Sequence, residues 1–108
     1  MNPVPKRTGP TNLYLAALMS APTAPRSDWC PTCHANATAT EHHIVPRAQG
    51  GHHGPTVYLC GHGTRGCHGA AEDRRLHFAY RDGAWYFRTT DVPTKYETAL
   101  TLPNWRRL

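Results

Sequence analysis

The chain has 108 residues and a formal net charge of +5, and only 15 of its residues are Leu, Val, Ile or Phe, about 14%. That fraction is too small for a barrel, a dinucleotide-binding domain or another large regular core, and no apolar run approaches the roughly 18 residues of a membrane span. The modest charge and the ten aromatic residues argue against a disordered chain. We therefore expect one small domain that needs disulfides, a metal ion or a partner for stability.

The N-terminal quarter is predicted to be a flexible arm that carries one short helix. Residues 1–10 hold three prolines and two basic residues, which favours irregular structure. Thr11 is suited to cap a helix that runs to Met19. The prolines of residues 21–25 end this helix and form a linker.

The middle of the chain has two strand signals followed by a helix signal. Residues 41–45 and 56–59 are rich in residues that favour strands, and a loop rich in Gly and His joins them over residues 46–55. Residues 67–75 lack helix breakers apart from Gly69 and predict a helix.

A β-hairpin and a short helical segment are predicted after this helix. Residues 76–80 and 85–88 are strand-like and flank the turn sequence of residues 81–83. Residues 93–100 favour one or two helical turns, and Trp105–Arg107 are expected to fray at the chain end.

The four cysteines form two pairs, Cys30 with Cys33 and Cys60 with Cys67. No signal peptide is visible, which predicts a cytoplasmic location, where cysteines more often bind metal than form disulfides. Zinc suits them because thiolates bind it tetrahedrally and a tight turn pre-organises a ligand pair. The first pair has the usual knuckle spacing, and three glycines permit a wider turn in the second. Two disulfides in a secreted mini-protein are the alternative.

One zinc ion bound by both pairs would tie together residues about 30 apart in the sequence. The two predicted strands and the predicted helix would then form a ββα unit that lies between the two halves of the zinc site. Zinc binding would supply folding free energy that the thin apolar core lacks.

Three histidines lie within this unit. His42 and His43 are on the first predicted strand, and His68 follows Cys67 at the start of the predicted helix. Closing the zinc site would bring them together. Two neutral imidazoles can hold a divalent ion, and a third can take a proton from water. Neighbours on a regular strand point to opposite faces, so the strand must twist or end there for both histidines to serve one centre.

These residues together resemble the HNH endonucleases, also called ββα-metal or His-Me finger proteins, in the form with a four-cysteine zinc site. The resemblance covers about residues 29–85, more than half of the chain, and residues 75–85 look like the tail of small phage-type members. The matching segments are Cys30–Cys33, His42–Pro46 with Gly50–Gly51, Val57–Cys60 and Gly66–Gly69.

The resemblance implies a small, zinc-stabilised α+β fold with a ββα-metal core and a C-terminal β-hairpin. Residues 27–92 would form the endonuclease domain, with an N-terminal arm in residues 1–26 and a C-terminal extension in residues 93–108.

The resemblance also implies a role for each matching residue. His43 corresponds to the general base that activates water. His42 and His68 correspond to ligands of a catalytic divalent ion such as Mg²⁺, Mn²⁺, Ni²⁺ or Zn²⁺. The structural Zn²⁺ would be bound by Cys30, Cys33, Cys60 and Cys67.

The middle asparagine of the family motif is missing from this chain. It should fall just before the second strand, where the chain has Gly54-Pro55-Thr56. In the family this asparagine braces the loop that bears the base. The hydroxyl of Thr56 could substitute in part, whereas Pro55 could not.

The implied activity is metal-dependent hydrolysis of DNA, by nicking as a monomer or by cutting as a dimer. Four arginines, Arg47, Arg65, Arg74 and Arg75, are candidates to bind the flanking phosphates. The implied partners are DNA and phage terminase or other packaging proteins, with no membrane. The alternatives are a zinc-ribbon-like DNA-binding module that lost cleavage and a zinc-stapled adaptor in a packaging complex.

The remaining polar and aromatic residues have less specific expectations. Glu41 is expected to be an exposed strand carboxylate, and the aromatic residues of 76–85 are expected to form a small second core, with base stacking as the alternative. The other five histidines are expected at the surface: His34, His52, His53, His62 and His77.

Overall fold

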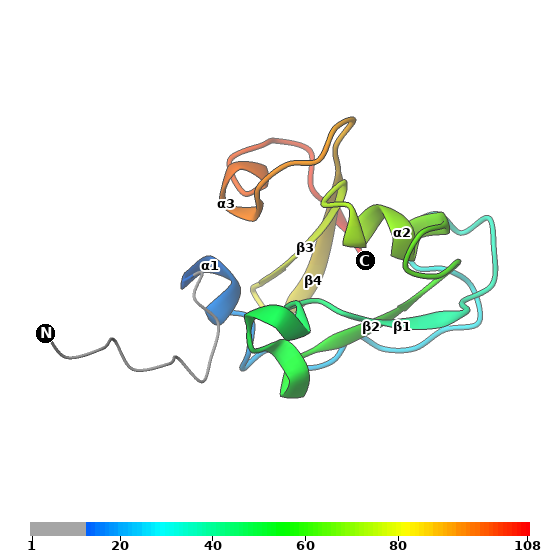
Figure 1. Cartoon of the computed structure of the whole chain (residues 1–108), viewed down its shortest axis with the longest axis horizontal. Coiled ribbons are helices and arrows are strands. Elements are labelled where there is room, and N and C mark those ends of the chain that lie inside the picture. The colour runs from blue at the N-terminus through cyan, green and yellow to red at the C-terminus, as the bar shows by residue number, and fades with distance from the viewer. Residues whose placement is uncertain (1–12) are drawn as a thin grey trace, which may run out of the picture.

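A computed structural model of the chain describes residues 13–108 (Figure 1). The predicted arm of residues 1–10 and the cap at Thr11 lie outside the described residues. The predicted small α+β class is confirmed, since the described part combines two antiparallel sheets with short helices. None of these helices has the length and apolar character needed to span a bilayer.

The first sheet pairs β1 (Thr40–His43) with β2 (Thr56–Leu59). The second strand has its predicted bounds, but the first begins one residue early and ends before Ile44. The chain turns there because Pro46 has no N–H for a ladder and restricts the residue before it. The loop between the strands contains two 3₁₀ turns, η1 (Arg47–Gln49) and η2 (Gly51–His53).

Helix α2 (Gly66–Glu72) contacts both strands of this sheet. It is shorter than predicted because Arg74 takes a left-handed φ of 60° and Arg75 N–H donates to the carbonyl of Ala70. This reversal leads the chain directly into the next strand. Gly69 lets the helix approach the preceding turn, where an added Cβ would lie 2.6 Å from the carbonyl carbon of Thr64.

The second sheet has the order β3 (Leu76–Arg81), β4 (Ala84–Thr89) and β5 (Arg106–Arg107). The predicted hairpin is confirmed, and its two-residue turn has positive φ at both Asp82 and Gly83, as a type I′ turn requires. The prediction that the chain end frays is wrong. Arg106 and Arg107 pair with the free edge of β4 instead.

The core is small and lies where the two sheets and α2 meet. Residues Ile44, Val45, Val57 and Leu59 of the first sheet and its loop are buried in it. The aromatic residues Phe78, Trp85 and Phe87 of the hairpin belong to the same cluster, so the prediction of a separate second core is wrong. Segments on both sides of the main body are bonded to the hairpin. Trp85 Nε1–H donates to the carbonyl of Pro22 at 2.8 Å, and the hydroxyl of Tyr96 donates to the carbonyl of Phe78 at 2.6 Å.

Two short helices lie beside each other at one end of the molecule, α1 (Leu13–Ala16) and α3 (Tyr96–Ala99) (Figure 1). The first was predicted to continue to Met19, but its α-helical part ends at Ala16 and is followed by turns. The second lies within the predicted helical segment of residues 93–100. Together they place the C-terminal extension against the main body of the chain.

Candidate functional site

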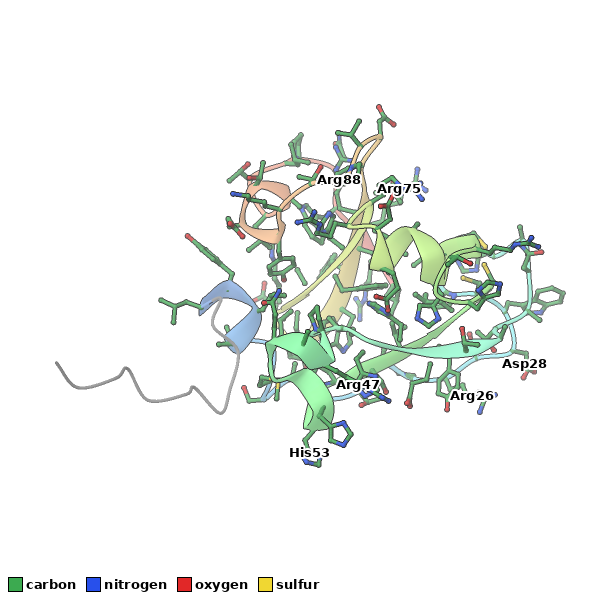
Figure 2. The ribbon with its side chains drawn as sticks, viewed as in Figure 1. Arg26, Asp28, Arg47, His53, Arg75 and Arg88 are labelled. Carbon is green, nitrogen blue, oxygen red and sulfur yellow. The ribbon has the colours of Figure 1, made fainter. Side chains whose placement is uncertain are left out.

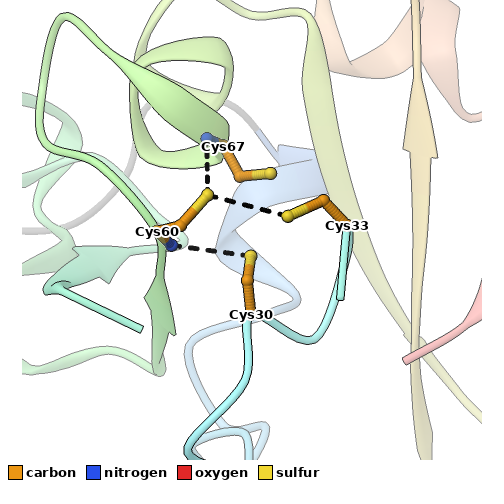
Figure 3. A group of neighbouring side chains, drawn as sticks. All are labelled: Cys30, Cys33, Cys60 and Cys67. Atoms are coloured by element: carbon orange, nitrogen blue, oxygen red, sulfur yellow. Dashed lines mark hydrogen bonds between the residues drawn. The ribbon is translucent and has the colours of Figure 1, made fainter. Parts of the chain in front are cut away.

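The four cysteine side chains converge on one point (Figure 3). Their sulfurs lie within 4.8 Å of one another, and all four are free thiols. The sulfurs of Cys33 and Cys60 are 3.8 Å apart. Tetrahedral zinc with Zn–S bonds of about 2.3 Å holds its sulfurs about 3.8 Å apart. The tetrad is therefore positioned to bind a metal ion, and its spacing is consistent with zinc.

Two tight turns bring these sulfurs together. In the first, the N–H of His34 donates to the carbonyl of Cys30 at 2.9 Å. In the second, His62 and Arg65 exchange two backbone hydrogen bonds. Gly61 has a φ of +82°, and a Cβ there would lie 2.1 Å from the carbonyl oxygen of Arg65. Glycine is thus required for the wider cysteine pair to close.

Hydrogen bonds and burial set the state of the thiols. The N–H of Cys60 donates to Cys30 Sγ at 3.5 Å, and the N–H of Cys67 donates to Cys60 Sγ at 3.4 Å. Burial alone would raise the pKa of Cys30, but hydrogen bonds from the Thr32 hydroxyl and from backbone N–H groups lower it from 9.0 to about 6. Burial raises the pKa of both Cys60 and Cys67. One thiolate forms readily, and a bound cation would deprotonate the others.

A second group of metal-ligand side chains lies between β1 and α2. His42 Nδ1 is 3.2 Å from Glu72 Oε1, and His68 Nε2 is 3.3 Å from the same oxygen. All three ligand atoms lie within 4.8 Å of one another, and we call this group the His–His–Glu cluster. The structure thus brings together His42 and His68, which the sequence singled out, and adds Glu72.

The sequence analysis missed Glu72. The signal was present, because Glu72 follows His68 by four residues on a predicted helix, and side chains four apart share one helix face.

The electrostatics of the His–His–Glu cluster favour cation binding. Burial lowers the pKa of His42 from 6.5 to about 4, against the opposing effect of the Glu72 carboxylate, so the ring is neutral near pH 7 and offers a lone pair. The Glu72 side chain is 51% exposed, which leaves the cluster open to solvent on one side. Two imidazoles and one carboxylate suit a divalent ion such as Mn²⁺, Ni²⁺ or Zn²⁺ and leave positions free for water or a phosphate oxygen.

His43 opens on the same pocket as His42. The pocket has a volume of about 710 Å³, and its lining includes His42, His43 and Glu72 on one side and Lys95 and Tyr96 on the other. Both residues are paired in the regular ladder with β2, His42 opposite Val57 and His43 opposite Thr56, so their side chains start from opposite faces of the strand. His43 is outside the His–His–Glu cluster, and its ring lies parallel to that of His52 with centroids 6.4 Å apart. His43 is therefore among the residues that line the pocket but not among the three candidate ligands.

The four predicted phosphate-binding arginines differ in position. Arg47 and Arg74 are exposed and line the pocket, and Lys95, which the sequence analysis did not single out, lines it as well. Arg65 is exposed on the turn between Cys60 and Cys67. Arg75 Nε is 2.6 Å from Asp73 Oδ2, so the Arg75 side chain is held in an ion pair. Figure 2 shows Arg47 on the loop after β1 and Arg75 well away from it.

Four of the remaining histidines are exposed as predicted: His34, His52, His53 and His62. The prediction for His77 is wrong, because its ring is buried beside Tyr96 and its Nε2–H donates to the carbonyl of Arg74 at 2.8 Å. Helix α3, which carries Tyr96, covers it. Glu41 is exposed as predicted, although it also borders the pocket.

Backbone contacts brace the β1–β2 loop where the family motif has its asparagine. The N–H of Ile44 donates to the carbonyl of Pro55 at 3.1 Å. Gly51 is packed so closely that a Cβ would lie 1.8 Å from the carbonyl oxygen of Val45. Within residues 13–108, Thr56 bonds through its backbone, to Thr23 Oγ1 and to the N–H of Ala24. The hydroxyl of Thr56 therefore does not take over the brace.

Comparisons with known proteins add no relative. No protein-family model matches the chain, and searches of curated proteins and of solved structures found no significant match. What the chain does must therefore be inferred from its own residues. Those residues bring His42, His68 and Glu72 close enough together to hold a metal ion, in a pocket that is also lined by His43 and by side chains of both charges.

Proposed function

We propose that the protein is a metal-dependent endonuclease of the HNH type that hydrolyses phosphodiester bonds of DNA. The observation that carries this proposal is the His–His–Glu cluster with His43 on the same pocket. A divalent ion, when bound there, supplies positive charge for the scissile phosphate and the leaving 3′ oxygen. His42, His68 and Glu72 hold the ion, and His43 takes the proton from the attacking water.

The proposal assigns the ββα-metal core to β1, β2 and α2. Its support is that the ligands come from β1 and α2, which contact each other, while the Cys60 to Cys67 turn joins β2 to α2. Structural zinc is assigned to the cysteine tetrad, whose sulfur spacing suits it. The two metal ions then have separate tasks, one in stability and one in chemistry.

Three cationic side chains of the pocket lining are candidates to bind a polyanionic substrate. Arg47, Arg74 and Lys95 line the pocket together with the carboxylates of Glu41, Glu72 and Glu97, and the three cations would bind phosphates near the scissile bond. Arg65 would bind further phosphates along the DNA backbone. Arg75 forms an ion pair with Asp73 instead. DNA as the substrate, and phage packaging proteins as partners, come from the family resemblance alone.

A DNA-binding module that lost cleavage is the second candidate. It is favoured by the missing asparagine, because the base-bearing loop is braced by backbone contacts rather than by a side chain at Thr56. Both candidates bind DNA in a salt-dependent way, but only the first nicks it.

A plasmid-nicking assay separates the two candidates. Wild-type protein is incubated with supercoiled DNA and Mg²⁺, Mn²⁺, Ni²⁺ or Zn²⁺, with EDTA as the metal-free control. We expect His43→Ala to slow nicking by about 100-fold or more, because it removes the general base. His53→Ala is the matched control, since His53 is exposed on η2 and does not line the pocket (Figure 2).

Salt-sensitive DNA binding without nicking in any of the four metals would overturn the nuclease proposal in favour of the binding module. Nicking that is equally fast in His43→Ala would overturn the role of His43.

A further inference from the structure

The hydroxyl of Thr40, the first residue of β1, lies directly behind the His–His–Glu cluster. Its Oγ1 is 2.8 Å from the carbonyl oxygen of Gly61 and 2.6 Å from Nδ1 of His68. A hydroxyl has one proton, and a carbonyl oxygen can only accept. The hydroxyl therefore donates to Gly61 and accepts a hydrogen bond from His68 Nδ1–H.

This pair of contacts fixes the tautomer of His68. Because Nδ1 carries a proton, Nε2 of the neutral ring carries the lone pair. That lone pair faces Glu72 Oε1 at 3.3 Å, where the carboxylate is also an acceptor. Two acceptors at this distance attract each other only through a cation, which is either a proton or a metal ion. The hydrogen bond behind the ring thus prepares Nε2 to be a metal ligand.

We propose that Thr40 is a positioning residue of the metal site, selecting the tautomer of His68 that binds metal through Nε2 and orienting the ring toward Glu72. The inference rests on the proposed function, and it deepens that proposal by naming a residue outside the ligand set. Partners behind ligating histidines typically change metal affinity by about 10- to 100-fold.

Thr40 also joins the two candidate metal sites. Its acceptor, Gly61, belongs to the turn between Cys60 and Cys67, and the N–H of His68 donates to the carbonyl of Cys60 at 3.1 Å. The turn between Cys60 and Cys67 therefore also positions the hydroxyl of Thr40, which in turn orients the ring of His68.

The test compares Thr40→Val, which removes the hydroxyl at nearly constant shape, with Thr40→Ser, which keeps it. Binding of Mn²⁺ is measured by calorimetry on protein that retains its cysteine-bound zinc. We expect Thr40→Val to weaken Mn²⁺ binding by about 10- to 100-fold and Thr40→Ser to bind nearly as wild type. Thr38→Val is the matched control, because the Thr38 hydroxyl bonds to Ser27, away from the cluster.

A second readout does not depend on bound metal. In protein with an empty His–His–Glu cluster, long-range ¹H–¹⁵N spectra of the neutral imidazole should show His68 protonated at Nδ1 and unprotonated at Nε2. Thr40→Val should lose this preference.

The outcomes separate the two proposals. The opposite tautomer in wild-type protein, or equal Mn²⁺ affinity in Thr40→Val and wild type, overturns the role of Thr40 alone. Wild-type protein that binds no divalent ion at the cluster overturns the metal site itself and, with it, the role of Thr40.

Discussion

At the scale of single residues, Glu72 is the side chain that adds a carboxylate to the two histidines of the candidate metal site. One carboxylate oxygen contacts both imidazoles, at 3.2 and 3.3 Å. Without it, the rings of His42 and His68 would have no negatively charged ligand group beside them. The negative charge of this side chain is therefore expected to be the largest single contribution to divalent-ion affinity.

Replacing this carboxylate by an amide should separate metal binding from folding. We expect Glu72→Gln to weaken Mn²⁺ binding by at least about tenfold and to slow nicking at subsaturating metal, with part of the rate recovered at high metal concentration. Calorimetry and the plasmid assay measure the two effects. Asp73→Asn is the matched control, since Asp73 is the next residue and pairs with Arg75 instead. Wild-type affinity in Glu72→Gln would show that the carboxylate is not a ligand.

The sequence indicates some of these residues and not others, for physical reasons. Paired cysteine spacing and the His42-His43 motif are local signals, so the tetrad and two members of the cluster could be named in advance. Thr40 could not be named, because its role depends on Gly61, 21 residues away. The burial of His77 was equally hidden, since the residue that covers it, Tyr96, is distant in the chain.

At the scale of elements, the β1–β2 loop continues directly from His43, the last residue of β1. The loop starts where β1 ends, and Gly51 is buried against Val45 with no room for a side chain. This close approach holds the loop in the place where the family motif would use an asparagine. The path of the chain just after His43 therefore depends on a glycine at position 51.

A methyl group at this glycine should disturb both stability and activity. We expect Gly51→Ala to lower the free energy of unfolding by about 1–3 kcal/mol, because its Cβ would meet backbone atoms of Val45, and to slow nicking by moving the loop. Urea unfolding in the presence of zinc provides the measurement. Gly63→Ala is the matched control, because a Cβ there meets nothing within 4 Å. Equal stability of the two variants would mean that the loop is not held at Gly51.

Regular elements were predictable where a local pattern creates them. The strand β2 and the β3–β4 hairpin follow from strand-forming residues and an Asp-Gly turn. The early end of α2 was not predictable, because it depends on a left-handed conformation at Arg74, which is uncommon for residues with a side chain. The strand β5 exists only because the edge of β4 is there to pair with it.

At the scale of the whole molecule, the shortage of large apolar residues is matched by two clusters of metal-ligand side chains. The buried apolar core is small. The cysteine tetrad brings together segments that are about 30 residues apart in the sequence. The His–His–Glu cluster lies next to this tetrad in the chain, since Cys67 and His68 are neighbours. Under the proposed function, one metal ion contributes to folding and the other to hydrolysis.

The most direct test of this division is the metal content of the purified protein, measured together with its nicking activity before and after EDTA treatment. We predict that one zinc ion per chain stays bound after EDTA, that a second divalent ion is removed, and that nicking stops and returns when Mn²⁺ or Mg²⁺ is added. Continued nicking by the EDTA-treated protein, or a protein without tightly held zinc that still unfolds cooperatively, would contradict the account.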